Sequence, residues 1–357
     1  MDEASDKRLP EACYVYGAGG FGRRLTTALV LAGVKVKGNI DQKFKKTVGR
    51  EVSTIDTDIT GQNVMIGIGN PATSLREVAN DLEQLGVAKI WSPVEVAVQL
   101  YRRNIDFSNY WLSGDISIYE EFSKEIEFAR SCLEDEASVS CFDSVLRYRQ
   151  YGEIADSSFA TPSDQIYAPR DISFLAEGMR FIDAGAFQGD TLIAMSKWAF
   201  QPEAVISFEP DPTNFSALAS VAKYMDFKVV CAPLGIGRKS ELLSFNVEGK
   251  ASSAFDPRGE SPIQVVSLDE MCLSWGPTHI KMDIEGAESE ALSGKQEILR
   301  KCRPSLALSA YHAPQHHWDL LLKIQSLNLD YAFYFRTYGE QTFDTVFYAI
   351  PRESVDT

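Results

Sequence analysis

The sequence predicts an α/β fold with two Rossmann-like domains, the first smaller than the second. Two segments support this prediction, CYVYGAGGFGRRL at residues 13–25 and FIDAGAFQGDT at residues 181–191. Each begins with a short apolar run typical of a buried strand and continues through closely spaced glycines into a helix-favouring stretch. A strand, a glycine turn and a helix are the building unit of a parallel sheet. The chain of 357 residues has room for two such domains.

The first domain is predicted at residues 12–100, after a disordered tail at residues 1–11. The GxGxxG pattern follows its first strand directly, in Gly17, Gly19, Gly20 and Gly22. Asp41 ends the next predicted strand, where an acid can hold a ribose while the glycines let backbone N–H groups approach a diphosphate. The rest of the domain is predicted as a strand and turn at 63–71, a helix at 74–87 and a strand at 88–96.

Two segments of this first domain, YGAGGFGRRL and IGIGNPATSLREV, carry a resemblance. They resemble the small Rossmann-like domain that precedes some sugar acetyltransferases and other sugar-modifying enzymes. The resemblance implies a nucleotide-sugar or a related diphosphate ligand. The alternative is a domain that keeps the fold without its ligand and serves docking or assembly, for instance in a homodimer. Both interpretations remain open from the sequence.

Residues 101–175 are predicted to form a helical connector followed by a loop. Apolar residues recur there at helical spacing, at Tyr119, Phe122, Ile126, Ala129 and Leu133. Such a stripe belongs more often to a packed core than to a binding site. Tyr167 lies in the loop at residues 157–171. The family resemblance of the second domain, described below, implies that this loop is near the entrance to the site, which makes Tyr167 a candidate for contact with either ligand.

The second domain is predicted at residues 176–357, and an acid precedes its glycine turn. Asp183 lies at the C-terminal end of the first strand, and Glu209 follows the next strand, Ala204–Phe208. A carboxylate in front of the glycines disfavours a pyrophosphate, whereas an ammonium group or ribose hydroxyls suit it. The pattern predicts a site for S-adenosylmethionine, and the alternative is an ordinary α/β turn with a surface acid. The predicted cofactor-binding residues are Asp183, Gly185, Ala186, Gly189, Glu209 and Asp211.

Six segments of this half resemble the FkbM family of S-adenosylmethionine-dependent methyltransferases. They are IDAGAFQGDT at 182–191, FEPDPTNF at 208–215, VVSLDE at 265–270, IKMDIEGAE at 280–288, PSLALSAYH at 304–312 and TVFYAIP at 345–351. The resemblance covers roughly residues 150–351, and IKMDIEGAE is its most specific part. It implies a seven-stranded class I methyltransferase domain. It also implies, as the usual activity, methylation of a hydroxyl on a sugar or another secondary metabolite.

His312, Asp283 and Glu285 are the predicted catalytic residues. A hydroxyl acceptor must lose its proton, and imidazole is the side chain whose ordinary pKa suits a general base near neutral pH. Strand alternation predicts Lys281, Asp283 and Glu285 on one side of a strand, at the floor of the cleft. The alternatives are a histidine satisfied at a strand end and an ion-pair network that only braces the site.

No metal site is predicted, because the sequence shows no metal-ligand spacing of its own. An oxygen-ligated cation held by Asp283, Glu285 and His312 is a minority alternative. His316 and His317, on the next predicted helix, are expected to face solvent or the domain surface.

The composition excludes several classes of function. A net charge of −15 and no long basic run argue against a nucleic-acid partner. The six cysteines form no CxxC pair, the N-terminus is polar, and no apolar run approaches the roughly 20 residues of a membrane span. We therefore expect a cytoplasmic enzyme that acts on a small-molecule acceptor such as a sugar or nucleotide-sugar. The alternatives are a nucleotide-sugar-binding scaffold or sensor with an inactive methyltransferase domain, and a nicotinamide oxidoreductase that uses the first glycine turn.

Overall fold

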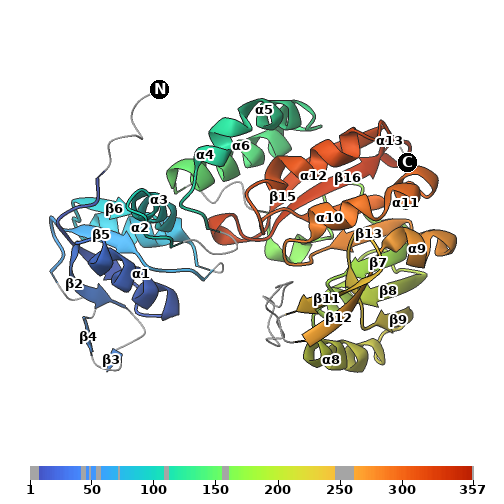
Figure 1. The fold of residues 1–357 in the computed structure, drawn as a ribbon, viewed down its shortest axis with the longest axis horizontal. Coiled ribbons are helices and arrows are strands. Elements are labelled where there is room, and N and C mark those ends of the chain that lie inside the picture. The colour runs from blue at the N-terminus through green and yellow to red at the C-terminus, as the bar shows by residue number, and fades with distance from the viewer. Residues whose placement is uncertain are drawn as a thin grey trace. The chain divides into compact units, whose positions relative to one another are not determined.

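The computed structural model divides into two compact units, which are described one at a time (Figure 1). The first unit comprises residues 1–123, 140–160 and 339–343, and the second comprises 124–139, 161–338 and 344–357. The structure describes residues 8–41, 46–47, 50–53, 58–70, 73–107, 112–154, 161–245 and 261–355. Residues 1–7 of the predicted tail and 157–160 of the predicted loop lie outside these ranges.

The first unit contains a six-stranded sheet with strand order β3-β4-β2-β1-β5-β6. Its strands are β1 Ala12–Tyr16, β2 Lys35–Ile40, β3 Lys46–Thr47, β4 Arg50–Ser53, β5 Asn63–Ile66 and β6 Lys89–Trp91. Its first helices are α1 Gly20–Leu31, α2 Leu75–Gln84 and α3 Pro93–Tyr101. Strand β1 pairs in parallel with β2 and with β5, which is the expected arrangement of successive strand–helix units.

One predicted strand of the first unit is wrong in its second half. The strand predicted at residues 88–96 ends at Trp91, and helix α3 begins at Pro93. Ser92 and Glu95 form a capping box, in which each side chain accepts a hydrogen bond from the other residue's backbone N–H. This cap and the proline at the first helical position start a helix where apolar β-branched residues had indicated a strand.

The connector is helical, as predicted, and consists of α4 Ser117–Glu121, α5 Ser123–Ser131 and α6 Glu136–Tyr151. Three members of the predicted stripe are buried, at Tyr119, Ala129 and Leu133. Within the second unit, Arg336 donates to the Asp135 carboxylate at 2.7 Å and to the Asp171 carboxylate at 2.8 Å. The connector is therefore part of the packed structure of the protein.

The second unit contains a seven-stranded sheet with order β15-β16-β14-β13-β7-β8-β9. Its strands are β7 Arg180–Ala184, β8 Ala204–Phe208, β9 Lys228–Ala232, β13 His279–Met282, β14 Ser305–Ser309, β15 Tyr331–Thr337 and β16 Thr345–Pro351. Strand β16 is antiparallel to β14 and forms the predicted closing hairpin with β15. The other neighbouring strands pair in parallel. This sheet confirms the predicted class I methyltransferase fold.

The second unit also holds a three-stranded sheet and several short helices. The small sheet has the order β10-β12-β11, with β10 Gly235–Ile236, β11 Glu241–Phe245 and β12 Ser261–Val266. The helices are α7 Asp190–Met195, α8 Pro212–Ala222, α9 Leu268–Cys272, α10 Glu288–Ser293, α11 Gln296–Lys301, α12 His316–Gln325 and α13 Arg352–Val355. Helices α10 and α12 pack against each other, which matters for the site described below.

The register of the seven-stranded sheet decides where the site lies. Asp183 on β7 is aligned with Ser207 on β8 and with Lys281 on β13. The carboxyl ends of these parallel strands therefore meet along one edge, and the loops that follow them lie next to one another. Fully buried apolar side chains such as Phe181 and Val205 hold the strands together beneath that edge.

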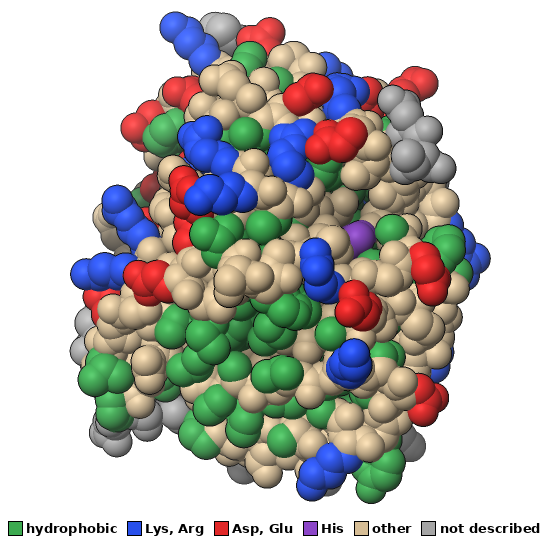
Figure 2. Space-filling view, turned by 90° about the vertical axis from the view of Figure 1, so that its right-hand side faces the viewer, with side chains coloured by type: hydrophobic (Ala, Val, Ile, Leu, Met, Phe, Trp, Pro, Cys, Tyr) green, Lys and Arg blue, Asp and Glu red, His purple; other side chains and the backbone are tan. Residues whose placement is uncertain are grey.

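The surface carries charges of both signs. On the face shown in Figure 2, Lys and Arg side chains lie among Asp and Glu side chains, around an area rich in hydrophobic side chains. Among the described residues, no helix is long and apolar enough to cross a membrane.

Candidate active site

The glycine turn after β7 is fixed by the loops around it. Gly185 has a φ of +75°, and a Cβ there would lie 1.8 Å from the carbonyl oxygen of Asp283. Gly189 has a φ of +91°, and helix α7 starts directly after it. The N–H groups of Gly185 and Ala186 both donate to the carbonyl of Phe208, at 3.0 and 2.9 Å. The turn therefore needs both glycines for its backbone and is tied to the end of β8.

Asp183 lies beneath this turn in a buried ion pair. Its Oδ1 is 3.0 Å from the Lys281 Nζ, and neither side chain is more than 2% exposed. The ammonium also donates to the carbonyl of Gly185 at 2.6 Å. Burial raises the pKa of Asp183 to about 6, and the charge of Lys281 opposes this rise. The pair thus places a carboxylate under the turn, ionised at neutral pH.

Glu209 lies at the end of β8 and supports the same turn from the other side. Its two oxygens accept hydrogen bonds from the N–H groups of Phe187 and Asp211, each at 2.9 Å. Burial raises the pKa of Glu209 to about 7, although these two N–H groups oppose the rise. Asp211 caps helix α8 through hydrogen bonds to its Oδ1, and Pro212 takes the first helical position, as predicted.

The loop after β13 brings two predicted catalytic carboxylates together, but not by strand alternation. Strand β13 ends at Met282, so Asp283 and Glu285 lie beyond it and the alternation argument was wrong. Glu285 has a φ of +54° and Gly286 a φ of +102°. A left-handed conformation is costly for a non-glycine residue and is frequent at functional sites. This tight turn directs both carboxylates toward His312.

His312 follows β14 and is surrounded by carboxylates. Its Nε2 lies 3.5 Å from Asp283 Oδ1 and 3.6 Å from Glu285 Oε2, and its Nδ1 lies 2.9 Å from Glu288 Oε1. Burial opposes a charge on the ring, but Glu288 and then the other two acids raise the pKa of His312 to about 9. Burial in turn raises the pKa of Glu285 to about 8, against the effect of His312. The structure thus brings all three predicted catalytic residues together.

Tyrosine hydroxyls complete this part of the site. Tyr167, the candidate from the loop, donates to Asp283 Oδ2 at 3.1 Å and shares a hydrogen bond of 3.0 Å with Ser309. Tyr311 donates to Asp283 Oδ1 at 3.3 Å, and its ring centroid is 4.1 Å from that of His312. Tyr311 and Ser309 were missed from the sequence, although both flank His312 in the segment LALSAYH.

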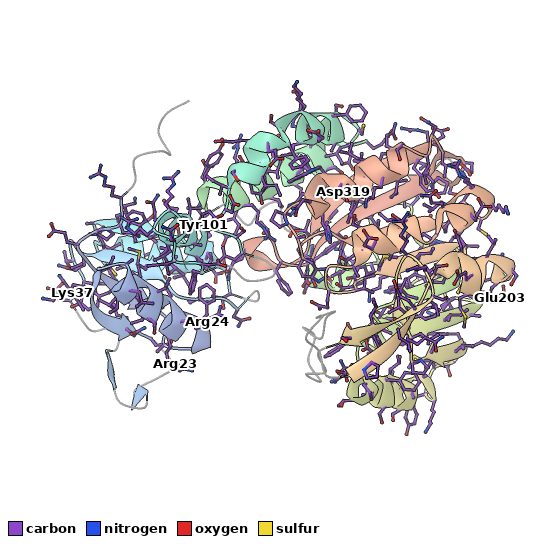
Figure 3. All side chains as sticks on the ribbon, viewed as in Figure 1. Arg23, Arg24, Lys37, Tyr101, Glu203 and Asp319 are labelled. Atoms are coloured by element: carbon purple, nitrogen blue, oxygen red, sulfur yellow. The ribbon has the colours of Figure 1, made fainter. Side chains whose placement is uncertain are left out.

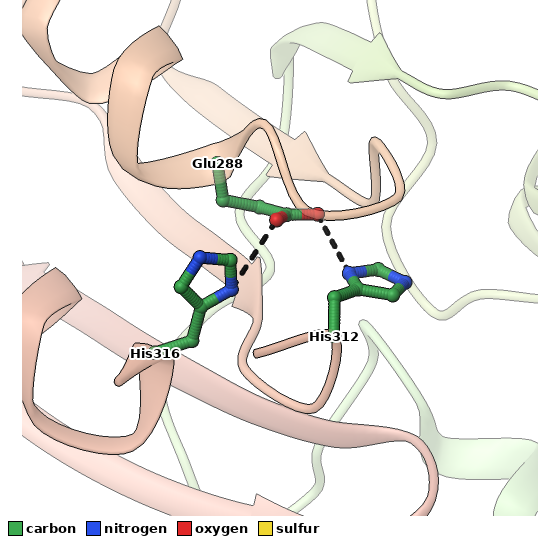
Figure 4. A group of neighbouring side chains, drawn as sticks. All are labelled: Glu288, His312 and His316. Carbon is green, nitrogen blue, oxygen red and sulfur yellow. Dashed lines mark ion pairs between the residues drawn. The ribbon is translucent and has the colours of Figure 1, made fainter. Parts of the chain in front are cut away.

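Two further residues of the site were also missed, Glu288 and His316 (Figure 4). The Glu288 carboxylate is fully buried between His312 and His316. The Nδ1 atom of His316 lies 3.4 Å from Glu288 Oε2. His316 and His317 are both buried, so the expectation that they face solvent was wrong. The reason is that the first turn of α12 packs against α10, a contact that helical periodicity alone does not reveal. A sequence signal existed in the i, i+4 spacing of His312 and His316.

The glycine turn of the first unit is built differently. A Cβ on Gly17 would lie 2.5 Å from Gly67 O, and one on Gly22 would lie 2.1 Å from Gly17 O, so these two glycines serve close packing. A Cβ on Gly19 would have no neighbour within 4 Å, and one on Gly20 would meet only Arg23 at 4.0 Å. Asp41 lies at the turn, as predicted, and accepts a hydrogen bond from Ala18 N at 2.7 Å.

A hollow adjoins the open side of this turn. Gly20, Phe21, Arg23, Arg24 and Thr27 line it. The two arginines extend from the first turns of α1, where they are labelled in Figure 3. Arg23 Nη1 donates to the carbonyl of Ala18 at 3.0 Å, and the Arg24 guanidinium lies 5.8 Å from the centre of the Phe21 ring. The open glycines therefore face a positively charged surface.

Comparison with known proteins identifies the second unit. Residues 183–334 match the family model described as the methyltransferase FkbM domain. This segment is an FkbM methyltransferase domain. The crystal structure of methyltransferase FkbM from Methylobacillus flagellatus KT has the same fold, with a TM-score of 0.76 and 21% identity over 95% of this chain and 90% of that chain.

A more distant match is Aeropyrum pernix fibrillarin in complex with natively bound S-adenosyl-L-methionine. Its TM-score is 0.33, with 11% identity over 53% of this chain and 73% of that chain. No curated protein matches the chain.

S-adenosylmethionine is the cofactor of this FkbM domain. The residues around the second glycine turn fit it. The Asp183 Oδ2 has no hydrogen-bond partner among the described residues, so a donor on the cofactor would find a buried acceptor there. Each oxygen of Glu209 keeps a lone pair beyond the backbone bond that it accepts, and these lone pairs suit the two ribose hydroxyls.

Proposed function

We propose that this methyltransferase transfers a methyl group to a hydroxyl of a small molecule such as a sugar or another secondary metabolite. One observation carries the proposal: the buried Nε2 of His312 faces the carboxylates of Asp283 and Glu285, within 3.6 Å of each. These groups follow strands β13 and β14, at the same sheet edge as the glycine turn after β7. An acceptor at this edge would have proton-accepting groups within reach.

The binding residues divide into those that hold the cofactor and those that shape its turn. We assign Glu209 to the ribose hydroxyls and Asp183 to a donor group of the cofactor. Lys281 holds Asp183 and the carbonyl of Gly185 in place. When bound, the cofactor supplies an electrophilic methyl group on a sulfonium, and the protein contributes position and electrostatics.

The cluster of His312, Asp283 and Glu285 takes up the proton that leaves the acceptor hydroxyl. Glu288, and then Asp283 and Glu285, raise the pKa of His312 to about 9. The ring therefore carries a proton at neutral pH, and the Asp283 carboxylate beside it is the group that accepts the proton. Tyr167 and Tyr311 hold the Asp283 carboxylate through their hydroxyls. Their hydrogen bonds keep Asp283 directed at the ring instead of at solvent.

The test is turnover with labelled S-adenosylmethionine across a panel of sugar and polyketide alcohols, with amines as the comparison class. We expect label on a hydroxyl, and loss of turnover in His312→Gln and Asp283→Asn while S-adenosylhomocysteine affinity stays within about twofold. Label only on nitrogen or carbon acceptors would refute the O-methyltransferase proposal. Wild-type turnover in both variants would remove the cluster from the mechanism.

We propose in addition that the first unit binds the diphosphate of a nucleotide-sugar. Two observations favour it: among the described residues no atom would lie within 4 Å of a Cβ on Gly19, and Arg23 and Arg24 line the adjoining hollow. Backbone N–H groups at the start of α1 and two guanidinium groups suit a dianion. The competing function is a scaffold or docking role without a ligand.

Point variants are the appropriate test of this second proposal. Removing the chain before about residue 102 would leave behind residues 140–160 and 339–343, which belong to the first unit. The variant Gly19→Val with Gly20→Val instead fills the open side of the turn. We expect it to lose affinity for a uridine diphosphate sugar in calorimetry. If the wild-type chain did not bind the uridine diphosphate sugar, the proposal would fail and the docking role would be the remaining function of the first unit.

A further inference from the structure

Three buried side chains converge next to the proposed active site. Glu288 begins helix α10, His312 follows strand β14, and His316 begins helix α12 (Figure 4). One oxygen or nitrogen atom of each lies within 4.8 Å of the others, and all three residues are buried. We call this group the Glu288 cluster.

The Glu288 carboxylate makes one close and one longer contact within the Glu288 cluster. His312 Nδ1 lies 2.9 Å from Glu288 Oε1, and His316 Nδ1 lies 3.4 Å from Glu288 Oε2. Within the described part of the chain, neither His316 Nδ1 nor Glu288 Oε2 has a hydrogen-bond partner. Buried polar atoms are normally satisfied, so these two neighbouring atoms indicate a missing partner.

The neighbouring lysines do not supply that partner. Lys295 is fully buried and close enough for its charge to interact with Glu288, but its Nζ makes no hydrogen bond to a described residue. Lys323 Nζ contacts Ser289 and lies 3.4 Å from Asp319 Oδ2. The Glu288 carboxylate therefore remains without a cation in contact with its Oε2.

We propose that the Glu288 cluster binds one first-row transition-metal ion, through the Glu288 carboxylate and the Nδ1 atoms of His312 and His316. Two imidazoles and a carboxylate are a common ligand set for Zn²⁺ and Fe²⁺, and nitrogen ligands disfavour Mg²⁺ and Ca²⁺. The set differs from an oxygen-ligated site at Asp283 and Glu285, because those residues face the opposite ring nitrogen of His312.

The groups around the cluster fit the usual surroundings of metal ligands. A metal-bound histidine commonly donates its other ring N–H to a carboxylate. With Nδ1 on the metal, the ring proton of His312 stays on Nε2, which faces Asp283 and Glu285. Glu288 Oε1 is itself held by the N–H of Ile284 at 2.8 Å.

The metal would act on His312 by positioning it. The cluster is buried, so an acceptor molecule would not reach the ion directly. The ion would join α10, α12 and the turn after β14 at one point and fix the orientation of the His312 ring. Asp283 and Glu285 would then be the members of the proposed proton-accepting cluster that take the proton. This proposal goes beyond methyl transfer, because metal binding needs neither cofactor nor acceptor.

The experiment uses the full chain, stripped with a chelator and titrated with Co²⁺, whose visible absorption reports nitrogen and oxygen ligation. We expect saturation at one ion per chain, displacement of the absorption by Zn²⁺, and zinc that stays with the protein through gel filtration. Glu288→Gln and His316→Ala should lose the absorption. His317→Ala is the matched control, because His317 Nδ1 faces the carbonyl of Pro314 at 2.9 Å and lies outside the cluster.

The measurement on the wild-type protein is sufficient to overturn the proposal. Folded wild-type protein that binds neither Co²⁺ nor Zn²⁺ would show that Glu288 only bridges two histidines. Metal binding that survives in both folded cluster variants would place the ion elsewhere. If either variant fails to fold, His316→Gln replaces it, because it keeps a polar side chain of similar length. S-adenosylhomocysteine calorimetry on the stripped chain tests the methyltransferase assignment separately, so that the two failures are distinguishable.

Discussion

The two glycine turns of this protein look alike in sequence and differ in what lies around them. In the second unit, the ion pair of Asp183 and Lys281 is buried under the turn, and Glu209 lies beside it. In the first unit, Asp41 accepts the N–H of Ala18, and two arginines line the adjoining hollow. The negative groups of the second turn suit a cofactor that carries hydroxyls and an ammonium group, whereas the arginines of the first suit a diphosphate.

The glycines differ in the same way. Gly185 is required by its left-handed backbone and by its approach to the carbonyl of Asp283. Gly19 has an extended backbone, with a φ of −67°, and open space where a Cβ would be. The spacing of glycines in a sequence therefore does not tell a glycine that is needed for close packing from one that leaves room for a ligand. The atoms that lie opposite each glycine in the structure make that distinction.

The largest expected difference between the two turns is in stability. Gly185→Ala places a Cβ against a backbone carbonyl in a left-handed conformation, and we expect a loss of about 3 kcal/mol or more in the free energy of unfolding. Gly19→Ala should change it by less than about 1 kcal/mol. Urea denaturation of the full chain measures both. Equal losses would mean that a side chain at position 19 meets a neighbour, as one at position 185 does.

The buried ion pair should give the next largest effect. Lys281→Met leaves the Asp183 carboxylate buried without its cation, and we expect it to cost about 3–5 kcal/mol of stability. The double variant Asp183→Asn with Lys281→Met removes both charges and should recover a large part of that loss. Denaturation of the two single variants and the double variant completes the cycle. Additive losses would mean that the two side chains do not interact.

Glu209 gives a test of the cofactor itself. Glu209→Gln should lower the affinity for S-adenosylhomocysteine about ten- to a hundredfold, since bonds to a charged group contribute about 1.5–3 kcal/mol. Because ribose hydroxyls donate to the ionised carboxylate, wild-type affinity should fall as the pH drops through about 7, the raised pKa of Glu209. The variant should lose this pH dependence. Asp41→Asn is the control in the first unit, and its affinity should match wild type.

The smallest effect is expected at the arginines of the first turn. Arg24→Gln should weaken binding of a uridine diphosphate sugar by a few fold, as is typical of one exposed charge at about 0.5–1 kcal/mol. Affinity for S-adenosylhomocysteine should be unchanged. Calorimetry at low and high salt checks the charge dependence, since screening should shrink the difference between the variant and wild type. If Arg24→Gln weakened S-adenosylhomocysteine binding and left binding of the uridine diphosphate sugar unchanged, the assignment of ligands to the two turns would be reversed.

Much of the architecture follows from local sequence. The strand that carries Asp183 near its C-terminal end, the strand before Glu209 and the N-cap at Asp211 were predicted from apolar runs and capping residues, and the structure confirms them. Such features depend on a few neighbouring residues. They are therefore visible without knowing which elements pack together.

The parts that were missed depend on tertiary contacts. Glu288 and His316 meet only because α10 packs against α12, which neither segment's own periodicity indicates. Glu285 has a left-handed backbone conformation, so strand alternation does not predict the direction of its side chain. The partner of Asp183 was likewise hidden, because the cross-strand register that aligns it with Lys281 becomes visible only in the assembled sheet.

Calorimetry of the full chain with S-adenosylhomocysteine, compared with NAD, tests the central claim most directly. We predict one S-adenosylhomocysteine site per chain, weakened in Glu209→Gln and unchanged when Gly19 and Gly20 are both replaced by valine. Tight binding of NAD with no binding of S-adenosylhomocysteine would contradict the claim. A site that survives Glu209→Gln but disappears in the double glycine variant would also contradict it, because the cofactor would then lie in the first unit.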